Sequence, residues 1–382
     1  MLTLRDPVHG AIVLDPVEAA LIDTAPMQRL RRIRQLGPTY LVFPGAEHSR
    51  FVHSVGACHV AGLLGETLRR DGWRGRPAML RVAALLHDVG HPPFSHAGER
   101  GVAHERVSAA MIRGGEIAGV LRAWDIDPEE VIATFDAHHD PVAAAVVSGQ
   151  LDADRMDYLL RDAHMCGVSH GVYDLPQLVA NVACGEDGIV VRREGLHAAE
   201  GLLLARTRMF LEVYFHRTRR LLDLLLAEVL PDFPAEDDVA GWLAWDDARV
   251  LERLRDDPRP AARALRDRRA LPVCVAAFEV SSDAEERTAA AELAHTLTEE
   301  LGAPPRVDSS ATLRAFRPDG DIPVRDPGGR VRSIFTASPV LRRMDPDIEL
   351  VRIYVPREQA EVAANAVEAW RRRGAQLRLF GD

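Results

Sequence analysis

Apolar residues in the first 225 positions recur mainly with the spacing of helices. The segment 78–88 (AMLRVAALLHD) is predicted to be a helix that ends at the doublet His87-Asp88, because glycine and proline residues follow it. A second helix is predicted from His53 to Arg70. Others are predicted at 16–36 (as one helix or two), 104–113, 128–138, 152–165, 175–183 and 197–229. Residues 1–15 alternate weakly instead, which favours a short hairpin or edge strand.

The pattern changes after residue 230. Residues 231–238 (PDFPAEDD) are acidic, and 255–272 carry several prolines and arginines. Strand-like runs follow at 273–280 and 350–355, with helix-like runs at 285–301 and 357–373. The sequence DPGG at 326–329 predicts a turn between strand-like flanks. We therefore predict a mainly α chain: an all-helical domain at 1–230 and a smaller C-terminal α+β lobe at 231–382, with oligomerisation or regulation as the expected role of the lobe.

Length and composition agree with a two-domain protein of the cytoplasm. The 382 residues exceed the roughly 100–200 residues of an ordinary domain. Hydrophobic residues make up 47% of the chain, yet no apolar run is long enough to span a bilayer, and the start (MLTLRDPVHG) lacks the regions of a secretory signal. The cysteines are scattered without a C-x-x-C pair, which disfavours a thiolate zinc site or a disulfide framework: Cys58, Cys166, Cys184 and Cys274.

Charge and histidine placement narrow the chemistry. The net charge of −10 would repel a nucleic-acid backbone, so we expect nucleic-acid binding to be absent or weak. The arginines between 29 and 34 are a candidate anion pocket, although such runs are usually a solvated helix face. Of the 15 histidines, only His295 lies beyond residue 216. Metal and proton-transfer chemistry is therefore expected in the first part of the chain.

The sequence contains two His-Asp doublets, so the dipeptide by itself proves little. His139-Asp140 leads into Pro141 and is most simply a helix end. His87-Asp88 instead ends an apolar helix and precedes VGHPPFSH, a glycine- and proline-containing break that opens space beside it. Imidazole and carboxylate ligands without thiolate suit Fe, Mn, Co, Ni or Zn. In isolation, however, this doublet could also be a helix terminus whose side chains contact carbonyls and solvent.

Two further segments add candidate ligands. His53 follows HSRFV at the start of a predicted helix. Asp154, Tyr158 and Asp162 fall at i, i+4 and i+8 of LDADRMDYLLRD, so a helix would place them on one face. An acid, a phenol and an acid do not form a core stripe. A surface ion-pair network is the alternative interpretation of that helix taken alone.

Together these motifs resemble a known family. HSRFVHS, ALLHDVGHPPFSH and LDADRMDYLLRD resemble the HD-domain phosphohydrolases, and more closely the SAM-and-HD-domain deoxynucleoside triphosphate (dNTP) triphosphohydrolases and their bacterial relatives. The opening DPVHGAIVLDPVEAALIDTAPMQRLRRIRQLG and FPGAEHSRFVHS resemble that group as well. The resemblance runs in order over about residues 4–225, so the helical domain 1–230 would be the HD-domain core.

The resemblance implies a metal site and an acid beside it. His53, His87, Asp88 and Asp154 would hold one divalent transition metal ion per chain, with Mg²⁺ accompanying the substrate phosphates. His104 would be the catalytic acid–base group, oriented by Glu99, which stands where mammalian members have Asp. His91 and His96 would line the phosphate path. The alternative for these two is a hydrogen-bonded loop histidine.

The resemblance also implies contacts to the substrate and to an activator. Arg50 and Arg155 would contact phosphates, and Gln35, Tyr158 and Asp162 would face the sugar. A second set matches residues that read a guanine base at an allosteric site between subunits: Asp23, Gln28 and Arg31. An ordinary polar helix surface explains that set equally well. A GTP or dNTP activator and a homo-oligomer, dimer or tetramer, are the partners that the resemblance implies.

The implied reaction is hydrolysis of a dNTP to a deoxynucleoside and inorganic triphosphate. One alternative is another HD-superfamily phosphomonoesterase or phosphodiesterase, in which His138 and His139 with His104 would supply a second metal site. Another is a non-catalytic nucleotide sensor on the same fold. Base preference, metal identity, the need for an activator and oligomer size stay open at this stage.

Overall fold

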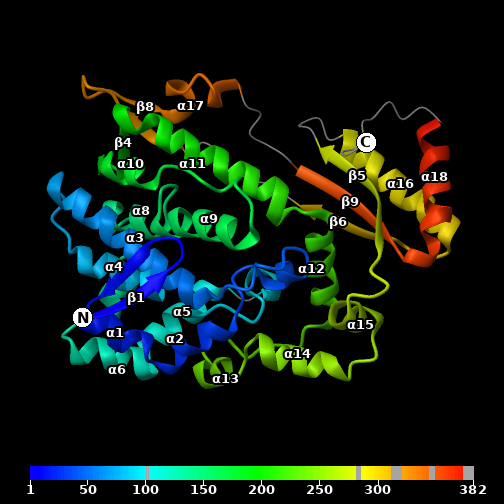
Figure 1. Ribbon diagram of the computed structural model, residues 1–382, viewed down its shortest axis with the longest axis horizontal. Helices are drawn as coiled ribbons and strands as arrows, with labels where there is room; N and C mark the ends of the chain where they lie inside the picture. The colour runs from blue at the N-terminus through cyan, green and yellow to red at the C-terminus, as the bar shows by residue number, and fades with distance from the viewer. Residues whose placement is uncertain (100, 102, 281–284, 311–320, 344–348, 373–382) are drawn as a thin grey trace. The chain divides into compact units, whose positions relative to one another are not determined.

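A computed structural model describes residues 1–99, 101, 103–280, 285–310, 321–343 and 349–372 (Figure 1). Within these residues, no helix is long and apolar enough to cross a membrane. The chain forms two compact units, and neither is one continuous segment. The first comprises 1–209, 230–253 and 321–343, and the second comprises 210–229, 254–320 and 344–382. The predicted division of the chain into domains 1–230 and 231–382 stays a prediction.

The first unit is mainly helical. Its helices are α1 (Pro16–Ile22), α2 (Ala25–Arg29), α3 (Arg50–Arg70), α4 (Pro77–Leu86), α5 (His104–Arg113), α6 (Gly115–Ala123), α7 (Pro128–Ala133), α8 (Pro141–Ser148), α9 (Ala153–Cys166), α10 (Leu175–Ala180), α11 (Leu196–Met209), α13 (Val239–Leu243) and α17 (Ile334–Ala337), and α14 (Asp247–Arg255) begins in it. Helix α3 packs against both α4 and α9. Val60 and Leu64 of α3, Leu80 of α4, and Met156 and Leu159 of α9 are almost fully buried, so all three helices contribute to this core.

Two small sheets belong to the same unit. Strands β1 (Leu2–Asp6) and β2 (Gly10–Leu14) form the antiparallel hairpin predicted for the first 15 residues. The second sheet has the order β3 (Val182–Cys184), β4 (Ile189–Arg192), β7 (Pro323–Arg325), β8 (Val331–Ser333), and only the β4–β7 pair is parallel. The predicted turn at 326–329 joins β7 to β8.

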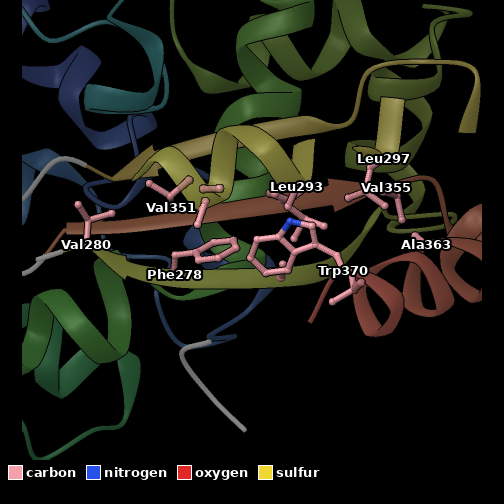
Figure 2. Close-up of a cluster of buried hydrophobic side chains, with 13 residues drawn as sticks. Phe278, Val280, Leu293, Leu297, Val351, Val355, Ala363 and Trp370 are labelled. Atoms are coloured by element: carbon pink, nitrogen blue, oxygen red, sulfur yellow. The ribbon is translucent and has the colours of Figure 1, made fainter. Parts of the chain in front are cut away.

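The second unit is an α+β layer structure. Strands β5 (Val273–Val280), β9 (Glu349–Val355) and β6 (Arg306–Ser310) form an antiparallel sheet in that order. Its helices are α12 (Arg217–Val229), α15 (Pro260–Asp267), α16 (Glu285–Leu301) and α18 (Ala360–Arg372). Phe278, Leu293, Ile353 and Trp370 belong to one buried cluster between the sheet, α16 and α18 (Figure 2). Alternate β9 side chains face the other way, where the Tyr354 hydroxyl donates to the Arg217 carbonyl of α12.

The predicted fold class, mainly α with an α+β C-terminal lobe, is confirmed. One predicted helix is wrong: residues 197–229 are not continuous. Helix α11 ends at Met209, residues 210–214 form a π-turn closed by the Phe215 N–H to the Phe210 carbonyl (2.7 Å), and α12 begins at Arg217. The rings of Phe210 and Tyr214 stack edge to face in this turn, with centroids 4.9 Å apart. A π-turn inserts an extra residue into a helical pattern, which apolar spacing does not reveal.

Candidate active site

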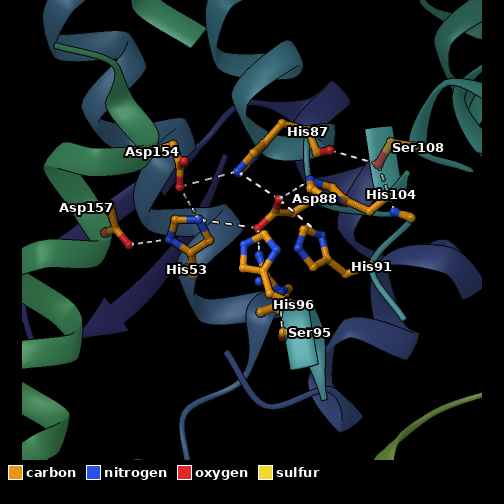
Figure 3. A network of polar contacts seen from close by, with 12 residues as sticks. His53, His87, Asp88, His91, Ser95, His96, His104, Ser108, Asp154 and Asp157 are labelled. Atoms are coloured by element: carbon orange, nitrogen blue, oxygen red, sulfur yellow. Dashed lines mark hydrogen bonds and ion pairs between the residues drawn. The ribbon is translucent and has the colours of Figure 1, made fainter. Parts of the chain in front are cut away.

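Three helices of the first unit bring candidate metal ligands together (Figure 3). His53 lies in the first turns of α3, His87 caps the C-terminus of the apolar helix α4, and Asp154 lies in the first turn of α9. One ligand atom from each of these residues lies within 4.8 Å of the other two. Asp88 adjoins them, with Oδ2 3.5 Å from His53 Nε2 and Oδ1 3.2 Å from His87 Nε2. All four predicted metal ligands therefore lie at one place.

Hydrogen bonds behind the two imidazoles orient them. His53 Nδ1 donates to Asp157 Oδ2 (2.8 Å), and His87 Nδ1 donates to the Ala84 carbonyl (2.7 Å). These bonds leave both Nε2 atoms facing the carboxylates of Asp88 and Asp154. Both Nε2 atoms are buried, and neither has a hydrogen-bond partner of good geometry. Buried polar atoms are rarely left so, and metal-bound histidines typically donate their other N–H in this way. The four residues thus fit a divalent metal ion.

Charge at the site supports the same fit. Burial disfavours a charged imidazole, but the carboxylates of Asp154 and Asp157 raise the pKa of His53 to about 10. Burial likewise disfavours the Asp154 carboxylate, whose pKa is nevertheless held well below its usual range by His53 and His87. The carboxylates therefore favour positive charge at the place where the imidazoles face them. A divalent ion supplies that charge, and neutral nitrogen with carboxylate oxygen suits Fe, Mn, Co, Ni or Zn.

A second group of side chains lies next to the first. Ligand atoms of His91, His96, Glu99 and His104 also lie within 4.8 Å of one another. Glu99 joins two of them: its Oε1 is 2.5 Å from His104 Nδ1, and its Oε2 is 3.1 Å from His96 Nδ1. Burial would raise the pKa of Glu99, but these two imidazoles lower it to about 2. An ionised Glu99 therefore orients the His104 imidazole through Nδ1.

Asp88 lies between the two groups. Its Oδ1 is 3.3 Å from His91 Nδ1 and 3.9 Å from His104 Nε2. The His91 ring is fully buried, with its centroid 3.7 Å from that of His104. Burial, together with the positive charge of Arg50, lowers the pKa of His91 well below its ordinary value. A neutral His91 and the His104 imidazole that Glu99 holds thus lie beside the carboxylate that faces the candidate metal centre.

The two predicted phosphate-binding arginines have partners within the protein. Arg50 is buried, pairs with Asp88 and donates from Nε to Ser95 Oγ (2.8 Å). Arg155 pairs with Asp152 and donates to the Gly149 carbonyl. Both guanidinium groups therefore form ion pairs and hydrogen bonds with other groups of the protein.

The predicted sugar-facing residues lie on α9 and before α3. The Asp162 carboxylate accepts from buried His48 (2.8 Å), and Gln35 Oε1 is buried without a hydrogen-bond partner. Burial raises the pKa of Tyr158 to about 12, so its phenol stays protonated. These side chains offer a carboxylate, an amide and a phenol as hydrogen-bonding groups for a hydroxyl-bearing ligand.

The predicted regulatory residues lie around α1 and α2. Gln28 donates to the Ile22 carbonyl (2.7 Å) and accepts from Arg31 Nε (2.9 Å). Asp23 caps the C-terminus of α1 and is exposed, as is Arg31. The neighbouring arginines do not form one anion pocket. Arg32 pairs with Asp246 and Arg34 with Glu47, whereas Arg29 is buried against backbone carbonyls.

The second doublet, His139-Asp140, lies at a helix N-terminus and has a capping role there. His138 and His139 are exposed, and neither belongs to a group of potential ligands within the part of the chain that the structure describes. Asp140 caps α8 by accepting from the N–H groups of Val142 and Ala143, both at 3.0 Å. The proposed second-metal set of His104, His138 and His139 therefore does not come together in this conformation.

Sequence reasoning missed the residue that orients His53. Asp157 is fully buried and accepts hydrogen bonds from His53, from both Arg161 Nε and Nη2 (2.8 Å each) and from His9 (2.6 Å). The i, i+4 spacing of Asp157 and Arg161 was the available signal. The contact with His9, contributed by the turn between β1 and β2, could not be read from spacing.

Comparisons with known proteins agree with this arrangement. Residues 50–162 match the family described as HD domain, and residues 173–369 match the one described as HD associated region. The crystal structure of a hypothetical protein from Aquifex aeolicus is 30% identical, covers 96% of this chain and 99% of its own, and superposes with a TM-score of 0.83.

Curated relatives match shorter stretches. The uncharacterized protein YwfO of Bacillus subtilis is 40% identical over 241 residues, which are 59% of this chain and 54% of the relative. Deoxynucleoside triphosphate triphosphohydrolase SAMHD1 of Homo sapiens is 29% identical over 275 residues, 60% of this chain and 44% of the relative. The chain thus spans about half the length of the curated relatives it matches. The two family matches and the full-length structural relative together show that this chain belongs to the HD-domain family and carries the HD associated region.

Proposed function

We propose that this chain hydrolyses deoxynucleoside triphosphates to a deoxynucleoside and inorganic triphosphate. The observation that carries the proposal is the adjacency of two groups: the His53, His87, Asp88 and Asp154 ligand set, and the Glu99–His104 pair within reach of Asp88. The relative named as a deoxynucleoside triphosphate triphosphohydrolase supports the substrate class. A metal held by the four ligands would polarise phosphoryl oxygens and lower the pKa of a water molecule.

The side chains then supply positioning and a proton. His104, held by Glu99 through Nδ1, directs Nε2 toward Asp88 and the reacting phosphate, where it gives its proton to the departing 5′-oxygen. Water adds to the α-phosphorus as the bond to that oxygen breaks, and the proton that the water loses passes to solvent, so that deoxynucleoside and intact triphosphate are released. His91 and His96 line the phosphate path, and Arg50 and Arg155 turn toward the phosphates when substrate replaces their present partners. Gln35, Tyr158 and Asp162 hydrogen-bond the sugar.

The same proposal includes regulation and assembly. Asp23, Gln28 and Arg31 form a polar surface that would read the base of a GTP or dNTP activator, and a homo-oligomer, dimer or tetramer, would complete it. Mg²⁺ would accompany the phosphates of the nucleotides. The exposure of Asp23 and Arg31 supports an accessible site.

A second candidate function rests on the second ligand group. Because His91, His96, Glu99 and His104 lie close enough to hold an ion, a dinuclear phosphomonoesterase or phosphodiesterase is the alternative. Metal analysis separates the two: one ion per chain supports the triphosphohydrolase, and two support the alternative.

One assay tests the proposal. The metal-loaded protein is incubated with each dNTP, with and without GTP, and the products are separated by chromatography. Release of inorganic triphosphate and deoxynucleoside is expected. Release of only monophosphate or orthophosphate, or activity that survives Asp154→Ala, would exclude it.

A further inference from the structure

The loop that carries three of the active-site residues makes an unusual turn. Phe94 and Ser95 are consecutive, neither is glycine, and both adopt left-handed backbone conformations, with φ of 60° and 58°. Such residues persist only where surrounding structure holds them. His91 precedes this turn, and His96 and Glu99 follow it. Gly37 lies so close that a Cβ there would be 2.7 Å from the Phe94 carbonyl oxygen.

A buried carboxylate from a distant segment holds the turn. Asp247, the first residue of α14, is 1% exposed. Its Oδ1 accepts the Phe94 N–H (2.7 Å), and its Oδ2 accepts the Arg34 N–H (3.0 Å). Burial raises the pKa of this carboxyl to about 6, although these donors oppose the rise. Burying a charged group is costly, so a carboxylate retained here has a positional role.

A buried guanidinium also binds this loop. Arg29 is 1% exposed and donates to the His91 carbonyl (2.7 Å) and to the Trp245 carbonyl (2.7 Å). Trp245 lies two residues before Asp247. One short segment, 245–247, is therefore bound to the loop at two points, by Asp247 directly and through Arg29. Figure 3 labels the loop residues His91, Ser95 and His96, of which His91 lies next to Asp88.

The turn also reaches the candidate metal ligands. Ser95 Oγ donates to the Arg34 carbonyl (2.6 Å) and accepts from Arg50 Nε (2.8 Å), and Arg50 pairs with Asp88. The bond from Ser95 Oγ to Arg34 joins two segments, and Asp247 accepts a hydrogen bond from each: from Arg34 itself and from Phe94, the residue before Ser95. We propose that Asp247 is a positioning residue, which with Arg29 holds the turn at Phe94–Ser95 so that Glu99, His104 and Arg50 meet the substrate. The kinetic part of this inference rests on the proposed function.

Asp247→Asn tests it against the matched control Asp246→Asn. Asparagine has one side-chain oxygen for two backbone donors, so its amide NH₂ opposes either the Phe94 N–H or the Arg34 N–H and one of the two bonds is lost. We expect kcat to fall about 10- to 100-fold with KM little changed, because misplacement of reacting groups by about 1 Å costs such factors. Metal content should stay at the wild-type level. Asp246 pairs with exposed Arg32 and caps α14, a role that asparagine also performs, so this control should match wild type.

A readout independent of substrate accompanies the kinetics. Hydrogen–deuterium exchange of the peptide covering 89–99 should be at least about ten-fold faster in Asp247→Asn than in Asp246→Asn, since the lost bond opens the loop locally. If the wild type releases no triphosphate but the exchange rates differ as stated, the proposed function fails and the positioning role stands. Equal exchange in the two variants would overturn the positioning role.

Asp247→Glu covers the case in which Asp247→Asn does not fold. It keeps the charge but displaces the carboxylate by one methylene, so a smaller fall in kcat and intermediate exchange at 89–99 are expected. Wild-type kcat and wild-type exchange in Asp247→Glu would overturn the proposal, as would a loss of bound metal equal to the loss of activity.

Discussion

Two His-Asp dipeptides lie in the first compact unit, one at the C-terminus of α4 and one before the N-terminus of α8. The side chains of His87 and Asp88 are 12% and 4% exposed and face His53 and Asp154 from two other helices. His139 is exposed, and the oxygens of Asp140 accept from the α8 backbone and from the Trp73 indole (3.0 Å). The dipeptide becomes part of a candidate metal site only where other segments supply further ligands.

The largest expected effect comes from removing a ligand that arrives from another helix. Asp154→Ala should lower phosphohydrolase activity by at least about 10³-fold, because a catalytic metal supplies several kcal/mol of charge stabilisation. Steady-state kinetics of the metal-loaded variant would measure this. Asp140→Ala is the matched control and should keep activity within about two-fold. Similar losses in both variants would break the contrast between the doublets.

A smaller effect is expected from the acid beside the metal group. Glu99→Gln removes the carboxylate that orients His104, so kcat should fall about 10²-fold while bound metal is retained. Glu105→Gln is the control, because Glu105 is exposed, with its carboxylate 3.6 Å from the same imidazole. A variant that loses both metal and activity at Glu99 would instead favour the dinuclear alternative.

The carboxylate behind His53 should affect affinity for the metal more than the chemical step. Asp157→Asn weakens the hydrogen bond that orients His53, and such outer contacts are worth about 10- to 100-fold in metal affinity. Titration with a metal-sensitive dye would give the dissociation constant. At saturating metal, activity close to wild type is expected, and an unchanged dissociation constant would contradict the assigned role.

The smallest effect concerns the second doublet. Asp140→Ala removes the cap of α8 and should lower the free energy of unfolding by about 1–2 kcal/mol without altering metal content. Urea denaturation followed by circular dichroism would measure the change. A loss of metal in this variant would show that the second doublet contributes to the centre.

Local patterns in the sequence predicted much of the fold. The predicted runs at 104–113, 273–280 and 285–301 coincide with α5, β5 and α16, since periodicity and flanking breakers are encoded locally. The predicted helices at 128–138 and 175–183 end earlier, at Ala133 and Ala180. The break at Phe210–Tyr214 was missed because a π-turn keeps an apolar helical spacing on both sides.

The candidate site was harder to predict from local sequence patterns than the fold. Its ligand set followed from the resemblance of the motifs around His53, His87-Asp88 and Asp154 to the HD-domain phosphohydrolases, since helix context alone left other interpretations open. The contacts that support these residues could not be predicted from the sequence. Asp157 meets His53 across 104 positions and Asp247 meets Phe94 across 153, and neither pairing leaves a periodic signal. Such contacts depend on tertiary packing, which brings buried charges to backbone groups that a sequence does not mark.

The most direct test of the central claim is metal content measured by mass spectrometry in two variants, His87→Ala and His139→Ala. Both remove one imidazole from a His-Asp doublet. We predict about one transition-metal ion per chain in His139→Ala, as in the wild type, and almost none in His87→Ala, because only His87 faces His53 and Asp154. Equal metal content in the two variants would contradict the account.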